Sequence, residues 1–122
     1  MIELRNVAYS YGGADLFTDL SLVLAPGSFH FLTGPSGSGK TTLMKLLYAE
    51  LLPTAGDVTI FGQSTRSMTR DAVATAREKV GFVHQDCQFL DHLTLAQNVM
   101  LPLAVAGRQA EAQGNIGELL AW

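Results

Sequence analysis

The sequence predicts an α/β fold built around a strand, a glycine-rich loop and a helix, and three adjoining segments carry that prediction. Residues 34–41 read Gly-Pro-Ser-Gly-Ser-Gly-Lys-Thr and fit the pattern G-x-x-x-x-G-K-[ST] at every required position. Residues 28–33 are mostly apolar and strand-like, and residues 42–47 carry apolar side chains at helical spacing. This order of strand, loop and helix is that of a P-loop NTPase. A glycine- and serine-rich loop that fitted the pattern by accident would not be expected to lie between a strand and a helix.

Two strands are predicted before this loop. Ile2, Leu4 and Val7 alternate with polar residues, as in a strand at the edge of a sheet. Residues 16–24 read as its partner, and residues 25–27, Ala-Pro-Gly, form the turn that ends it. P-loop enzymes need a parallel sheet with several crossovers, and few crossovers fit in 122 residues. The chain is therefore expected to be a fragment.

Beyond the loop and its helix, turn signals separate short regular segments. Residues 52–56 form a turn, and residues 57–62 read as a further strand and turn. Residues 71–79 are expected to be helical, and residues 80–84 form a β-rich run.

The last helical pattern begins at Thr94, which is the expected N-cap. Its apolar side chains recur at helical spacing: Leu95, Val99 and Leu103. This helix is expected to break near Pro102 or Gly107. Residues 119–122 read as part of a further amphipathic helix with no stop signal, which also favours a fragment.

The loop supplies the groups that a triphosphate needs. Gly34, Gly37 and Gly39 let the backbone approach closely with its N–H groups turned inward. The helix that begins near Lys40 adds unpaired N-terminal donors and the positive end of its dipole. Lys40 would reach the β and γ phosphates, and the hydroxyl of Thr41 would coordinate the Mg²⁺ that accompanies the nucleotide.

Composition narrows the cellular setting. The net charge of −3 gives no electrostatic support for a nucleic acid partner. The single cysteine, Cys87, excludes a disulfide within the chain and favours a reducing compartment. The first residues lack the basic start and apolar stretch that are typical of a signal peptide. The longest apolar run, Val99–Ala106, is shorter than the ~20 residues of a membrane-crossing helix. We therefore expect a cytoplasmic protein whose membrane contact comes only through a partner.

Four segments, in this order and spacing, resemble the nucleotide-binding subunits of ABC transporters. They are VAYSY (7–11), GPSGSGKTTLMKLL (34–47), PTAGDVTIFG (53–62) and EKVGFVHQD (78–86). The later segment FLDHLTLAQNVMLPLAVAGR (89–108) is most similar to the FtsE subfamily of bacterial cell division and to its relative, the LolD subfamily of lipoprotein release.

The resemblance covers the whole chain and implies a truncated ABC-type nucleotide-binding domain. Residues 1–86 would form the N-terminal part of the ATPase core, with its β subdomain, Walker A loop and Q-loop. Residues 87–122 would form the incomplete start of the helical subdomain.

The resemblance also assigns site residues. Tyr11 matches the aromatic residue that stacks on adenine, with Tyr9 as a competing candidate; base stacking is worth about 1–3 kcal/mol in single-stranded nucleic acid complexes. Gln85 matches the Q-loop glutamine, which contacts the metal and the attacking water and senses the membrane partner. Lys40 and Gln85 are thus the expected catalytic residues, and Thr41 and Gln85 the expected Mg²⁺ ligands. The expected ATP-binding set is Tyr11, Gly34, Pro35, Ser36, Gly37, Ser38, Gly39, Lys40, Thr41 and Thr42.

One position departs from the family pattern. A bulky apolar residue is more usual than His84 before the glutamine, and we favour a packed, hydrogen-bonded ring over a change in how the loop is held. His30 and His92 have no metal-ligand spacing with Cys87 or with each other, so no metal is expected beyond nucleotide-bound Mg²⁺. Residues 93–106 are either core or a groove for a short helix of a membrane subunit.

In this family, two subunits sandwich two ATP molecules and drive a membrane partner. The resemblance implies a homodimeric subunit on the cytoplasmic face of the bacterial inner membrane, acting with a permease-like subunit of the FtsX type. The family's signature, Walker B strand with catalytic Glu, and switch His do not occur in the sequence, so this chain alone is expected to be inactive. Two alternatives stay open: another P-loop enzyme such as a small-molecule kinase, and a non-catalytic ATP binder.

Overall fold

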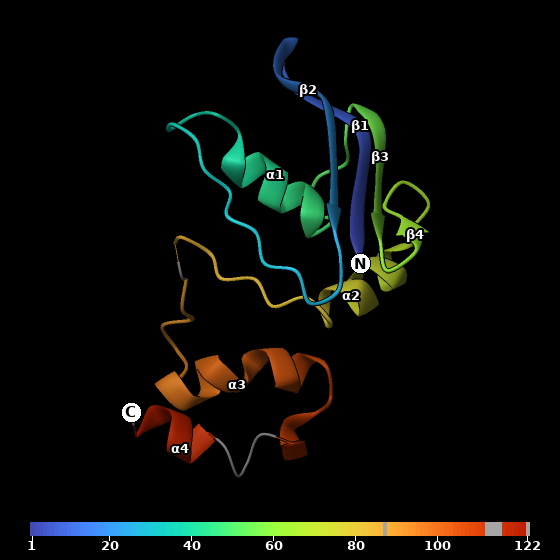
Figure 1. The fold of residues 1–122 in the computed structure, drawn as a ribbon. Helices are drawn as coiled ribbons and strands as arrows, with labels where there is room; N and C mark the ends of the chain where they lie inside the picture. Colours follow the sequence, from blue (N-terminus) through green and yellow to red (C-terminus); the bar gives the residue numbers. More distant parts are fainter. Residues whose placement is uncertain (87, 112–115, 122) are drawn as a thin grey trace. The chain divides into compact units, whose positions relative to one another are not determined.

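The computed structural model describes residues 1–86, 88–111 and 116–121, which form two compact units (Figure 1). The first unit spans Met1–Phe82, and the second begins at Val83. The boundary predicted from the sequence is at residue 86. Cys87 and Trp122, on which two of the expectations rest, lie outside the described residues.

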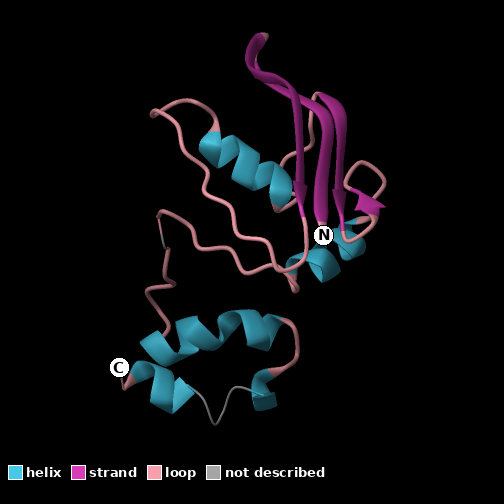
Figure 2. Cartoon of the chain, viewed as in Figure 1, coloured by secondary structure: helices cyan, strands magenta, loops and turns pink. Residues whose placement is uncertain are grey.

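The first unit is built around a four-stranded sheet (Figure 2). Its strands lie in the order β2-β1-β3-β4. Their bounds are Ile2–Tyr11 for β1, Ala14–Leu24 for β2, Ala55–Ile60 for β3 and Gln63–Ser64 for β4. All three pairings are antiparallel. The strand expected at residues 16–24 and the strand and turn expected at residues 57–62 are both confirmed.

The edge position expected for the first strand is wrong. β1 pairs with β2 on one side and with β3 on the other, so it is an inner strand. Its alternating apolar residues reflect one buried face, on which Leu4 and Val7 are fully covered. Such alternation does not distinguish an inner strand from an edge strand, because both can bury one face.

The pairing of β1 with β2 is irregular at Asn6 and Asp19, whose φ angles are 48° and 52°. Asn6 Nδ2 donates a hydrogen bond of 2.6 Å to Asp19 Oδ1, and Asn6 N donates one of 3.0 Å to Ser21 Oγ. Asn and Asp tolerate this left-handed conformation because their short polar side chains bond locally. The register of the pair shifts here, so both strands bend.

Helix α1 (Lys40–Leu47) covers one face of the sheet (Figure 1). The buried core consists of Leu4 and Val7 from β1, Val58 and Ile60 from β3, and Leu43 and Leu46 from α1. Burying each of these side chains is worth about 1.5–3 kcal/mol. The helix expected after the glycine-rich loop is confirmed, and this packing sets the position of its first turn.

Helix α2 (Arg70–Arg77) confirms the helix expected at residues 71–79, with an earlier start after the N-cap Thr69. Arg77 Nε donates to Tyr48 O at 3.1 Å, and its Nη2 donates to Ala49 O at 2.9 Å. Its guanidinium also lies 4.9 Å from the centre of the Tyr48 ring. A cation that bonds the last carbonyls of a helix stabilises that end, so Arg77 holds the end of α1 opposite the loop.

Two segments expected to be strands are not strands. Within the described part of the chain, residues 28–33 and 80–84 do not belong to any strand. The side chains of Phe31 and Val83 are 84% and 91% exposed. β-propensity measures how a side chain packs on a pleated, half-buried surface, so an apolar run needs a neighbouring strand before it becomes one.

In the second unit, helix α3 (Leu95–Val105) begins after Thr94, as expected. Gln97 N donates to Thr94 Oγ1 at 3.2 Å, and Thr94 N donates to Gln97 Oε1 at 2.8 Å, which is a reciprocal capping box. The break considered at Pro102 does not occur, and the helix instead ends just before Gly107, whose φ angle is 71°. A proline removes one helical hydrogen bond, and a helix capped in this way tolerates that loss.

A 3₁₀ turn, η1 (Gln109–Glu111), and helix α4 (Ile116–Leu120) follow. No side chain of α3 is fully buried, and Leu95 and Val105 are 61% and 82% exposed. Within the described residues, no helix has both the length and the apolar character that a membrane crossing requires.

Gly56→Ala is expected to destabilise the first unit strongly. Gly56 has a φ angle of 75°, and a Cβ there would lie 2.2 Å from Asn6 O, a main-chain atom in the sheet. We expect a loss of at least about 2 kcal/mol in the free energy of unfolding, because backbone strain alone costs about 1–3 kcal/mol. Urea unfolding followed by circular dichroism measures it.

Gly62→Ala is the matched control for this substitution. Its φ angle is 84°, and a Cβ there would meet nothing within 4 Å. Gly62→Ala introduces the same kind of backbone strain as Gly56→Ala but no contact with Asn6 O. Equal losses of unfolding free energy in the two variants would therefore contradict the role given to Asn6 O.

Candidate phosphate-binding site

The loop before α1 is closed by tight contacts at two glycines. Gly39 has a φ angle of 92°, and a Cβ there would lie 2.9 Å from side-chain carbons of Leu16 and 3.2 Å from Phe17. A Cβ on Gly34 would lie 2.8 Å from Ser38 Oγ. Glycine at these positions lets the loop pack on β2 at one end and fold back on itself at the other.

The first turn of α1 carries no side-chain cap. Gly39 is the N-cap residue, and the first backbone hydrogen bond of the helix runs from Leu43 N to Gly39 O at 2.9 Å. The N–H groups of a first helical turn have no acceptor within the helix, and the dipole places partial positive charge there. This is the geometry of an anion site.

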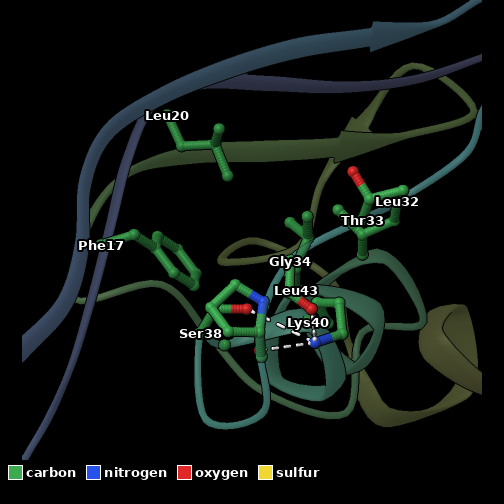
Figure 3. Close-up of a pocket in the computed structure, with 10 residues that line it drawn as sticks. Phe17, Leu20, Leu32, Thr33, Gly34, Ser38, Lys40 and Leu43 are labelled. Atoms are coloured by element: carbon green, nitrogen blue, oxygen red, sulfur yellow. Dashed lines mark hydrogen bonds between the residues drawn. The ribbon is translucent and has the colours of Figure 1, made fainter.

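The ammonium of Lys40 lies against the loop. Its Nζ donates to Gly34 O and to Pro35 O, both at 2.7 Å, and reaches Ser38 Oγ at 3.5 Å (Figure 3). These contacts use all three donors of the ammonium. Neutral oxygens therefore hold the positive charge over the loop. Phosphate oxygens can replace them, because a hydrogen bond between two charged groups is stronger than one between an ammonium and a neutral oxygen.

A pocket of about 330 Å³ adjoins the loop. One side of it is made by loop and helix residues: Gly34, Pro35, Ser38, Gly39 and Lys40. Apolar side chains form much of the rest, namely Phe17 and Leu20 of β2, Leu32 and Leu43 (Figure 3). This apolar wall was not predicted from the sequence. The sequence feature that indicated the wall was the apolar content of residues 16–24. This content does not show which side chains face the loop, because the strand is irregular at Asp19 and the alternation of its two faces is interrupted there.

Tyr11 stands at the end of β1 and is 55% exposed. Its hydroxyl lies 3.3 Å from Thr42 Oγ1, which ties the end of β1 to the first turn of α1. Tyr9 is half-buried and packs edge-to-face on Tyr11 with ring centres 4.9 Å apart. Burial raises the pKa of the Tyr9 phenol, and its interaction with Tyr11 raises it further. Of the two candidates for base stacking, Tyr11 is the accessible one.

The remaining predicted residues fall in different places. Thr41 is exposed in the first turn of α1, whereas Thr42 is buried. Gln85 is exposed in the second unit, while the loop, Tyr11 and Thr42 belong to the first. His84 is also exposed, so the packed ring favoured for it is not observed. The described residues contain no group of three His, Cys, Asp or Glu side chains placed to hold a metal ion.

In a comparison with known protein families, residues 17–122 match the ABC transporter family. The chain is 36% identical over 110 residues to the cell division ATP-binding protein FtsE of Bacillus subtilis (strain 168), covering 89% of this chain and 48% of FtsE. It is 38% identical over 123 residues to the macrolide export ATP-binding/permease protein MacB of Salmonella paratyphi A, covering 93% of this chain and 19% of MacB.

The fold is similar to a dimeric structure of the ATP-binding cassette MJ0796 in a post-hydrolysis state with bound ADP and Pi. The TM-score is 0.81 at 30% sequence identity, and the match covers 93% of this chain and 55% of that chain. This similarity confirms the predicted α/β fold of an ABC-type nucleotide-binding domain. The chain spans about half the length of FtsE and of the MJ0796 chain.

Tyr11→Ala is expected to weaken ATP binding about 5- to 150-fold, the equivalent of a stacking energy of about 1–3 kcal/mol. Inorganic triphosphate has no base to stack, so its affinity should stay unchanged. Tyr11→Phe keeps the ring and should keep the affinity for ATP. Isothermal titration calorimetry with both ligands measures these values, and a loss confined to Tyr9→Leu would assign the stacking to Tyr9 instead.

Proposed function

The chain belongs to the ABC transporter family, and we propose that it is the nucleotide-binding part of an ABC ATPase that binds MgATP through residues 34–42. The observation that carries this proposal is the position of Lys40, whose Nζ lies 2.7 Å from two carbonyls of the loop, beside the uncapped N-terminus of α1. A flexible cation beside the unpaired N–H groups of a first helical turn is suited to the β and γ phosphates of a nucleotide.

The resemblance to ABC ATPases suggests a role in MgATP binding for each of the predicted site residues. Thr41 would hold Mg²⁺ through its hydroxyl, and Gln85 would contribute a second oxygen and orient the attacking water. Tyr11 would stack on the adenine, and the backbone of residues 34–42 would bind the phosphates. When bound, Mg²⁺ neutralises phosphate charge.

Within the family, we propose an FtsE-like ATPase subunit that acts in bacterial cell division. The 36% identity to FtsE supports this, together with the similarity of residues 89–108 to that subfamily. In the whole protein, two copies would sandwich two ATP molecules and act on a permease-like membrane subunit of the FtsX type, at the cytoplasmic face of the inner membrane. The 38% identity to MacB favours the alternative, a LolD-like lipoprotein-release subunit or another exporter ATPase.

ATP hydrolysis belongs to the complete cassette in this proposal. The signature, the catalytic Glu and the switch His of the family do not occur in the 122 residues, so the chain alone would bind ATP without appreciable turnover. A full-length protein that binds ATP and does not hydrolyse it beside its membrane partner would favour a regulatory ATP binder. Phosphorylation of an acceptor molecule would favour a kinase.

Lys40→Ala is expected to weaken MgATP binding about 10- to 150-fold while leaving the fold intact, because a charged hydrogen bond is worth about 1.5–3 kcal/mol. Lys45→Ala is the matched control: Lys45 lies on the same helix and pairs with Glu50 at 3.2 Å. Titration calorimetry gives both affinities. Wild-type affinity in Lys40→Ala, or an equal loss in Lys45→Ala, would contradict the assignment of Lys40.

Gln85→Ala is expected to leave ATP affinity without Mg²⁺ largely unchanged and to reduce the gain in affinity that Mg²⁺ brings. The reason is that a glutamine oxygen would contact the ion and make no contact with the base or phosphates. Titrations with MgCl₂ and with EDTA measure the difference, and Gln88→Ala, another exposed glutamine of the second unit, is the control. Loss of ATP binding in EDTA would show that Gln85 has a structural role.

A further inference from the structure

Tyr11 stands at an end of the sheet that has little packing of its own. Gly12 and Gly13 join β1 to β2 there with φ angles of 57° and 93°, and Tyr11 pairs with Ala14 across this turn. Residues 11–15 are exposed, and a Cβ on either glycine would meet no heavy atom of the described residues within 4 Å, apart from its chain neighbours. The orientation of the Tyr11 ring must therefore come from contacts of its own side chain.

One such contact is with Tyr9, two residues earlier on the same strand. The two rings pack edge-to-face, with their centres 4.9 Å apart and their planes inclined at 74°. Side chains two residues apart on a strand lie on the same face, which brings the rings together. In an edge-to-face pair one ring covers at most one face of the other, so at least one face of Tyr11 is left open by Tyr9 for a base.

The other contact of Tyr11 does not fix the plane of its ring. The hydroxyl lies 3.3 Å from Thr42 Oγ1, whereas a hydrogen bond between two hydroxyls is usually about 2.7–2.8 Å long. Rotation about χ2 turns the ring around an axis that passes through the hydroxyl oxygen, and this torsion has a broad energy minimum in tyrosine. The ring can therefore turn while the hydroxyl stays in place, and the packing against Tyr9 is what sets the plane.

Tyr9 can hold Tyr11 because Tyr9 is itself held by the core. It is half-buried and packs against the buried core that joins the sheet to α1. It pairs with Phe17 of β2, and the centres of these two rings lie 6.4 Å apart. Phe17 in turn lines the pocket beside the loop (Figure 3), and a Cβ on Gly39 would lie 3.2 Å from its ring. A row of aromatic side chains thus links Tyr11 to the start of α1.

We propose that Tyr9 is a positioning residue for nucleotide binding, which fixes the plane of the Tyr11 ring and thereby holds the base-stacking surface in a set place relative to the phosphate-binding loop. The proposal rests on the stacking role proposed for Tyr11, and it assigns Tyr9 no contact with the nucleotide. A ring that is already oriented loses less conformational entropy when a base stacks on it, so the affinity for the nucleotide rises.

Tyr9→Leu is expected to weaken ATP binding about 2- to 12-fold, the range that corresponds to one aromatic pair. Inorganic triphosphate has no base, so its affinity should stay unchanged. Tyr9→Phe keeps the ring and should keep the affinity for ATP. Isothermal titration calorimetry with both ligands measures these values. Wild-type ATP affinity in Tyr9→Leu, or equal losses for ATP and triphosphate, would overturn the proposal.

A double variant distinguishes positioning from direct stacking. Without the Tyr11 ring there is nothing to position, so Tyr9→Leu should cost no further ATP affinity in a Tyr11→Ala background. A further loss in that background would indicate a contact between Tyr9 and the base and overturn the proposal.

The single variants separate this proposal from the one on which it rests. Unchanged ATP affinity in Tyr11→Ala would show that Tyr11 does not stack on the base, and both proposals would be wrong. A loss in Tyr11→Ala with none in Tyr9→Leu would leave the stacking role in place and overturn the positioning role alone.

Tyr48→Leu is the matched control, because Tyr48 is another half-buried tyrosine of the first unit and packs against Phe82 and Arg77. This substitution should leave the ratio of the ATP and triphosphate affinities unchanged. A change in that ratio as large as the change in Tyr9→Leu would contradict a specific role for Tyr9.

NMR spectroscopy tests the geometry without any substitution. Nuclear Overhauser contacts between the ring protons of Tyr9 and Tyr11 should be present in the nucleotide-free chain, because the proposed orientation exists before binding. Addition of ATP should shift the ring signals of Tyr11 more than those of Tyr9, since the base stacks on Tyr11. Absence of the contacts between the rings, or a larger shift at Tyr9, would overturn the proposal.

Discussion

The candidate site depends on the packing of α1 against the sheet. Leu43 and Leu46 are buried among side chains of β1 and β3, and Arg77 holds the opposite end of the helix through two carbonyls. The residues of the loop itself are almost all exposed and contribute little packing of their own. The helix therefore fixes where Lys40 and the free N–H groups lie, and the glycines let the loop follow it.

The electrostatics of the site are local. The whole chain is acidic, with a net charge of −3, yet the first turn of α1 contains no acidic side chain. Lys40 and the helix dipole thus add their positive charge at one point, without a carboxylate to offset them. The direct acceptors of Lys40 are neutral oxygens, so an anion at the loop would offer the ammonium stronger, charge-assisted hydrogen bonds in their place.

Features set by neighbours in the sequence were predictable, and features set by distant partners were not. The loop pattern, the helix after it and the N-cap at Thr94 each depend on a few adjacent residues, and the structure contains all three. The inner position of β1 depends on β3, about fifty residues away. Residues 28–33 are not a strand, because among the described residues no neighbouring strand pairs with them, and their apolar content could not reveal this. The apolar wall of the pocket was missed for the same reason, because it follows from the pairing irregularity at Asp19.

The phosphate-binding pocket adjoins an apolar groove of about 510 Å³ that is lined by β2, residues 28–32 and α1. Leu20, Leu32 and Leu43 line both of them, and Leu32 is only two residues before Gly34. Interiors pack densely, so a side chain shared by two cavities cannot move for one without changing the other. Residues 28–33 lead directly into the loop, so the path of their main chain sets the position of Leu32 and with it one wall of the pocket. The packing of the groove therefore also helps to define the shape of the phosphate site.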